Sequence, residues 1–75
     1  MQTTDFIVHI DETLDPTALE AIEDEIRHRN GVLSAGHRSD QPHLVQVVYD
    51  SDATQMAAIV EDVRQRGLHA QAVGL

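Results

Sequence analysis

The sequence has no cysteine, no tryptophan and no lysine, and it has one phenylalanine and one tyrosine among 75 residues. Without thiols the chain can form no disulfide, no thiolate metal site and no cysteine nucleophile. With so few aromatic rings, its core has to be built from aliphatic side chains, and a chain of this length supports one core only. We therefore expect residues 1–75 to form a single small domain.

Positive charge is also scarce. Five arginines face 13 acidic residues, which gives a net charge of −8. Nucleic acids and anionic membranes both select a basic face, so neither is an expected partner. No stretch approaches the roughly 20 apolar residues that span a bilayer, and the first ten residues carry no positive charge. We expect a cytoplasmic protein.

The hydrophobic pattern changes period along the chain and predicts six elements. Apolar residues alternate with polar ones in the expected strands and recur every three to four residues in the expected helices. In chain order these are strand 5–10, helix 15–31, strand 32–36, strand 43–50, helix 51–67 and strand 68–73. This order predicts an α+β ferredoxin-like βαββαβ sandwich, with both helices on one face of a four-stranded antiparallel sheet in the order 4-1-3-2.

Capping residues mark the ends of both expected helices. Asp15 is suited to cap the first helix, and Pro16 is suited to its first position. The second helix has Asp52 and Thr54 as possible caps. A glycine ends each helix, and we expect the first of the two to adopt the left-handed conformation. These are Gly31 and Gly67.

The charged side chains of the helices are expected on their solvent-facing sides, Glu23 among them. Their spacing favours ion pairs four residues apart along each helix. The pairs are Glu23–Arg27, Glu25–Arg29 and Asp62–Arg66. These pairs account for the carboxylates, no glycine-rich phosphate loop is present, and the serines show no base beside them, so we expect no enzyme.

Several short features occur in a fixed order over most of the chain. They are Ile22-Glu23, Gly31-Val32, Tyr49-Asp50, Thr54, Ala58-Ile59 and Gly67-Leu68-His69-Ala70. In this order and spacing the chain resembles the heavy-metal-associated (HMA) domain. That family includes copper chaperones, mercury-binding proteins and the amino-terminal modules of metal-pumping ATPases. The resemblance implies the same ferredoxin-like sandwich.

The family's metal loop corresponds to residues 13–18. Counting back from Gly31 places Thr13 at the family's methionine, and Asp15 and Ala18 at its two cysteines. Thiolates hold soft metals, and a carboxylate with a methyl group cannot replace them. The resemblance therefore implies an HMA-like domain that binds no metal by the family mechanism, and we expect no cofactor.

Five histidines leave room for a different metal site. In the predicted sheet, His9 and His69 lie on neighbouring strands and point to the face without helices, and Asp11 or Glu12 could supply a third ligand. His9, His69 and Asp11 are therefore an alternative site for a divalent metal. His37 and His43 flank a turn and could chelate a metal locally, but we expect them to be ordinary loop residues.

The sheet face without helices carries more aliphatic side chains than a monomer requires, which predicts a docking surface for a second copy or another protein. The residues expected there are Ile7, His9, Leu44, Gln46, Val48, His69, Gln71 and Val73. We therefore expect a non-enzymatic interaction or assembly module that acts through this face or through the loop 11–16, with divalent metal binding as the alternative. A further alternative is a small-ligand sensor similar to ACT domains, which share this topology, although Thr17 follows Pro16 where those domains have glycine.

Overall fold

The computed structural model describes residues 1–73 and contains four strands and two helices. The elements are β1 (Thr3–Ile10), α1 (Pro16–Arg27), β2 (Val32–Gly36), β3 (Leu44–Asp50), α2 (Met56–Arg64) and β4 (Ala70–Val73). The βαββαβ order matches the order predicted from the hydrophobic periods.

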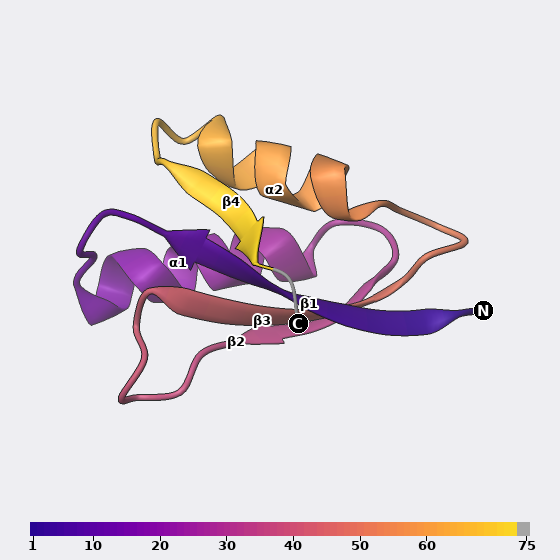
Figure 1. The fold of residues 1–75 in the computed structure, drawn as a ribbon, viewed down its shortest axis with the longest axis horizontal. Coiled ribbons are helices and arrows are strands. Elements are labelled where there is room, and N and C mark those ends of the chain that lie inside the picture. The colour runs from indigo at the N-terminus through magenta and orange to yellow at the C-terminus, as the bar shows by residue number, and fades with distance from the viewer. Residues whose placement is uncertain (74–75) are drawn as a thin grey trace.

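The four strands form one antiparallel sheet in the order β2-β3-β1-β4, which confirms the predicted order 4-1-3-2. β1 lies between β3 and β4, and its register pairs Ile7 with Gln46 on one side and with Val73 on the other. α1 packs against β2, α2 packs against β4, and the helices touch each other. Figure 1 shows α1 passing behind the sheet and α2 lying beside β4.

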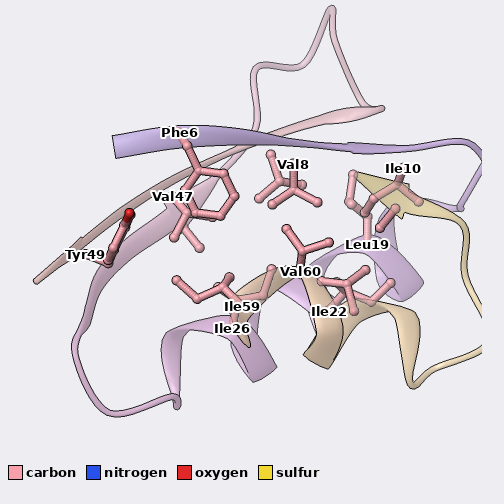
Figure 2. Close-up of a cluster of buried hydrophobic side chains, with 14 residues drawn as sticks. Phe6, Val8, Ile10, Leu19, Ile22, Ile26, Val47, Tyr49, Ile59 and Val60 are labelled. Atoms are coloured by element: carbon pink, nitrogen blue, oxygen red, sulfur yellow. The ribbon is translucent and has the colours of Figure 1, made fainter. Parts of the chain in front are cut away.

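The core lies between the sheet and the helices and is almost entirely aliphatic. Alternate residues of the two central strands point into it, as period-two patterns require. Its larger buried members are Phe6, Val8 and Ile10 of β1, Val45, Val47 and Tyr49 of β3, Leu19, Ile22 and Ile26 of α1, and Ile59, Val60 and Val63 of α2. Figure 2 shows many of these side chains filling the space between the two layers.

The start of α2 differs from the sequence expectation. Gln55 occupies the N-cap position and makes no side-chain capping hydrogen bond, so neither Asp52 nor Thr54 caps this helix. Thr54 is instead buried, and its hydroxyl accepts a hydrogen bond from Arg29 at 2.9 Å. Met56, the first residue of α2, is 39% exposed.

The edge strands also differ in detail. β2 is an edge strand, as the predicted strand order requires, and its pairing with β3 is irregular between Val32 and Ser34. β4 begins at Ala70, two residues later than predicted, because Leu68 and His69 still belong to the connection from α2. The main-chain oxygen of His69 nevertheless accepts a hydrogen bond from the Asp11 N–H at 2.9 Å.

The predicted exposure of Glu23 is wrong, because this side chain is only 1% exposed. Two of the three predicted ion pairs are wrong as well, since their charges join the two helices instead of neighbouring turns. Arg29 pairs with Asp62 at 2.6 Å, and Arg66 pairs with Glu25. Only Glu23–Arg27 is present, at 4.0 Å.

Candidate functional site

The loop between β1 and α1 is organised around the N-cap of α1. Asp15 has an extended backbone conformation, and its Oδ1 accepts a hydrogen bond from the Ala18 N–H at 2.7 Å. This bond satisfies one of the free N–H groups of the first helical turn, so the predicted capping role is confirmed. The two residues at the family's cysteine positions are therefore bonded to each other, one through a carboxylate and the other through its backbone.

Glu12, in the same loop, holds the segment that leads into β4. Its carboxylate accepts hydrogen bonds from the His69 backbone N–H at 2.9 and 3.1 Å and lies 2.7 Å from the ring Nδ1 of His69. The side-chain hydrogen bond lowers the pKa of Glu12 and raises the pKa of His69. The His69 side chain is 81% exposed, so this contact lies at the surface.

His9 has different neighbours from those the sequence suggested. Its ring stacks on that of His43, with the centroids 6.1 Å apart and the planes at 20°. Oδ1 of Asp11 lies 3.1 Å from its Nδ1. The structure thus brings His9 and Asp11 together, as expected, while His69 turns to Glu12. In residues 1–73 no group of three or more histidine or carboxylate side chains is placed to hold a metal ion.

A buried carboxylate fixes the start of the loop after β2. Oε2 of Glu23 lies 2.7 Å from Nδ1 of His37, whose side chain is one-quarter exposed (25%). Nη2 of Arg27 lies 4.0 Å from the other carboxylate oxygen of Glu23. The Nε of Arg27 also donates a hydrogen bond to the main-chain oxygen of Ala35 at 2.8 Å. His37 is therefore not an ordinary loop residue, because it provides the hydrogen-bond partner that a buried carboxylate requires.

The sheet face opposite the helices carries four half-buried aliphatic side chains, which we call the aliphatic patch. They are Ile7, Leu44, Val48 and Val73. Beside them lie the exposed Gln46, which donates to Asp5 at 3.1 Å, and the exposed Gln71, which pairs with His9 in the β1–β4 register.

Part of the aliphatic patch lines a shallow hollow of about 540 Å³. Ile7, Leu44 and Val48 contribute from the sheet, and His37 and Arg38 contribute from the loop after β2. The bond from His37 to Glu23 holds this loop in place, so a buried contact on the helix side shapes the hollow on the opposite face.

Comparison with solved structures identifies the architecture. Oxidized MerP from Ralstonia metallidurans CH34 superposes with a TM-score of 0.85 at 11% identity, over 97% of this chain and 100% of that one. This chain has the fold of a heavy-metal-associated domain. The N-terminal domain of a potential copper-translocating P-type ATPase from Bacillus subtilis also reaches 0.85, at 19% identity over 97% and 90% of the two chains. The copper chaperone of Enterococcus hirae reaches 0.80 at 15% identity, over 91% and 98%.

The HMA-like fold is thus shared at low sequence identity, and this chain has no cysteine with which to bind soft metals. No protein-family model matches the sequence, and no curated protein matches it. Within residues 1–73, neither helix is long and apolar enough to cross a membrane.

Proposed function

We propose that this chain is a non-enzymatic HMA-like domain of the cytoplasm that binds another protein, or a second copy of itself, through the aliphatic patch. The observation that carries the proposal is the patch itself. Ile7, Leu44, Val48 and Val73 gather on the sheet face that the helices leave uncovered. Contiguous aliphatic surface beside a hollow is typical of sites where a partner docks.

The metal loop supports a role other than soft-metal transfer. The similar structures include a copper chaperone and the copper-loaded domain of a potential copper-translocating ATPase. Here the corresponding positions hold Asp15, which is engaged as a helix cap, and Ala18, which has no ligand atom in its side chain. The domain keeps the scaffold and lacks the thiolates, so we infer that its remaining role is recognition of a partner.

The proposal is tested by site-specific photo-crosslinking in the native cell. A photoreactive amino acid replaces Val48 in the patch in one variant and Ala21 on the exposed side of α1 in a matched control. We expect protein adducts from position 48 and none of comparable yield from position 21. Adducts only from position 21 would show that the helices, and not the patch, form the docking surface.

A substitution identifies the occupant. Ile7→Asp places a charge in the centre of the patch, and Ala21→Asp places the same charge on the exposed side of α1 as the control. If the occupant is a second copy, sedimentation equilibrium shows a dimer that Ile7→Asp disrupts and Ala21→Asp leaves intact. If it is another protein, the chain sediments as a monomer and Ile7→Asp removes the crosslink from position 48.

A further inference from the structure

β4 ends the sheet, so one side of its main chain is not paired with another strand of the described chain. The His69 oxygen accepts a hydrogen bond from the Asp11 N–H, which fixes the residues of this segment that bond toward β1. Hydrogen-bonding direction alternates along an antiparallel strand, and the β1–β4 register is regular through Ala70 and Ala72. The N–H and C=O groups of Ala70 and Ala72 therefore point away from β1.

A side chain occupies the outward-pointing oxygen of Ala70. Arg64, the last residue of α2, donates a hydrogen bond from Nε to this oxygen at 2.8 Å. A hydrogen bond from a charged donor is stronger than one between neutral groups. The Arg64 side chain is half exposed, and it lines a shallow hollow of about 370 Å³ together with Ala70. Arg64 therefore lies over an acceptor that an added strand would use, with open space beside it.

The β2 edge at the other side of the sheet carries the same contact and a second protection. Arg27, the last residue of α1, donates from Nε to the main-chain oxygen of Ala35. The β2–β3 pairing is also irregular between Val32 and Ser34, and such a bulge hinders strand addition because it twists the edge. β4 pairs with β1 in a regular register, so its edge depends on Arg64.

The sequence of β4 is compatible with pairing to a second copy of itself. Its residues AQAV include no proline and no charged side chain, which are the residues that commonly protect an edge strand. In an antiparallel pair with a twofold axis at Gln71, Ala70 of one copy lies opposite Ala72 of the other, and the contact recurs across the axis. Each such pair exchanges an N–H and a C=O in both directions, and the small alanine side chains permit the approach.

We propose that the β4 edge is a self-association site of this chain and that Arg64 keeps it closed. A second copy pairs with the edge only after the guanidinium leaves the Ala70 oxygen, so each copy has to break a charge-assisted hydrogen bond. The net charge of −8 further opposes the approach of two copies. The proposal is independent of docking through the aliphatic patch, because the patch presents side chains and the edge presents main-chain groups.

Sedimentation velocity of the full chain over a range of concentrations tests the proposal. Arg64→Ala should strengthen self-association about tenfold or more relative to the native chain, because pairing no longer breaks the bond to Ala70. Arg66→Ala is the matched control, since it makes the same change of charge and its side chain pairs with Glu25 and not with the edge. This control should sediment as the native chain does.

A second substitution separates strand pairing from aggregation of unfolded chains. Ala72→Pro removes an N–H that points away from β1, so it leaves the β1–β4 hydrogen bonds in place and blocks an added strand. The double variant Arg64→Ala with Ala72→Pro should return to the sedimentation of the native chain. Amide spectra check that each variant is folded.

Amide hydrogen exchange in Arg64→Ala gives a readout without proline. Protection of the Ala72 N–H should rise with protein concentration, because pairing removes this group from water, while the exposed amide of Gln71, which points toward β1, serves as the internal reference. The proposal is overturned if Arg64→Ala sediments as the native chain does or if Arg66→Ala associates equally. Ala72 exchange that is independent of concentration in an associating Arg64→Ala variant would also overturn it.

Discussion

The guanidinium of Arg29 lies 2.6 Å from the carboxylate of Asp62 and ties the turn after α1 to α2. The same side chain donates from Nε to the hydroxyl of Thr54 at 2.9 Å. Thr54 is only 8% exposed, so Arg29 is the partner of a hydroxyl that is nearly removed from water. One arginine thus joins the helices and satisfies a buried polar group.

Arg29→Ala should lower the free energy of unfolding by about 1–2 kcal/mol, because it breaks a partly exposed ion pair and leaves the Thr54 hydroxyl unpaired. The matched control is Arg66→Ala, which removes the other helix-joining pair, with the exposed Glu25, and should cost under about 1 kcal/mol. Urea denaturation followed by circular dichroism measures both. Equal losses would show that the Thr54 contact contributes nothing.

Gly31→Ala should destabilise the domain by about 1–3 kcal/mol. Gly31 has a φ of +96°, and an added Cβ would lie 2.9 Å from the Cβ of Ala53 and 3.0 Å from Cγ2 of Thr54. Gly36→Ala is the matched control, because its φ is not positive and a Cβ there meets no atom within 4 Å. Thermal melts of both variants test the contrast, and a Gly36→Ala variant as unstable as Gly31→Ala would contradict it.

His37→Ala should cost about 1–3 kcal/mol, because it leaves the buried carboxylate of Glu23 without its hydrogen-bond partner. Glu23→Leu combined with His37→Ala should lose less than His37→Ala alone, since removal of both polar groups leaves neither unpaired. Arg38→Ala, at the exposed next residue, should change stability by less than about 0.5 kcal/mol. Chemical denaturation of the three variants would refute this account if the double variant were the least stable.

The contact between Glu12 and His69 should be strongest in a defined pH window. The hydrogen bond raises the pKa of folded His69 above its ordinary 6.5, so that stabilisation is complete below pH 6.5 and is lost as the pH rises through the raised value. It lowers the pKa of Glu12 below 4.5, so that contribution is present above pH 4.5 and is lost as the pH falls through the lowered value. Both contributions to stability are therefore complete between pH 4.5 and pH 6.5.

Glu12→Gln should return the His69 imidazole to a lower pKa, measured by an NMR titration of the ring protons. Glu61→Gln removes an exposed carboxylate near Arg64 instead and serves as the control. An unchanged titration of His69 in Glu12→Gln would mean that the contact does not form in solution.

The fold was predictable from the sequence because the spacing of apolar residues within each segment indicates whether that segment is a strand or a helix. The hydrophobic pattern within each element indicates which of its sides is buried. In β1 the apolar residues alternate, at Phe6, Val8 and Ile10. In α1 they recur on one face, at Leu19, Ile22 and Ile26. The N-cap at Asp15 was predictable for the same reason, since the cap and its N–H partner are three residues apart.

The side-chain contacts could not be predicted in this way, because their partners lie far apart in the chain. Glu23 follows Ile22 on α1, and only the course of the loop after β2 brings His37 to cover it. His43 reaches His9 through the exact position of its turn. Arg29 follows Glu25 by four residues, which suggested a pair along the helix, but the packing of the two helices places Asp62 beside it instead.

Because the Ala18 N–H is bonded to the carboxylate of Asp15, the stability of the domain should not depend on the redox state of the solution or on a bound metal ion. The first turn of α1 is closed by a carboxylate, which neither oxidises nor requires an ion to hold its place. With no sulfhydryl in the chain, reductants and oxidants have no cysteine to act on. The scaffold should therefore unfold at the same temperature in dithiothreitol, in glutathione disulfide and in a strong chelator, across conditions that would alter a thiolate-bearing domain of the same shape.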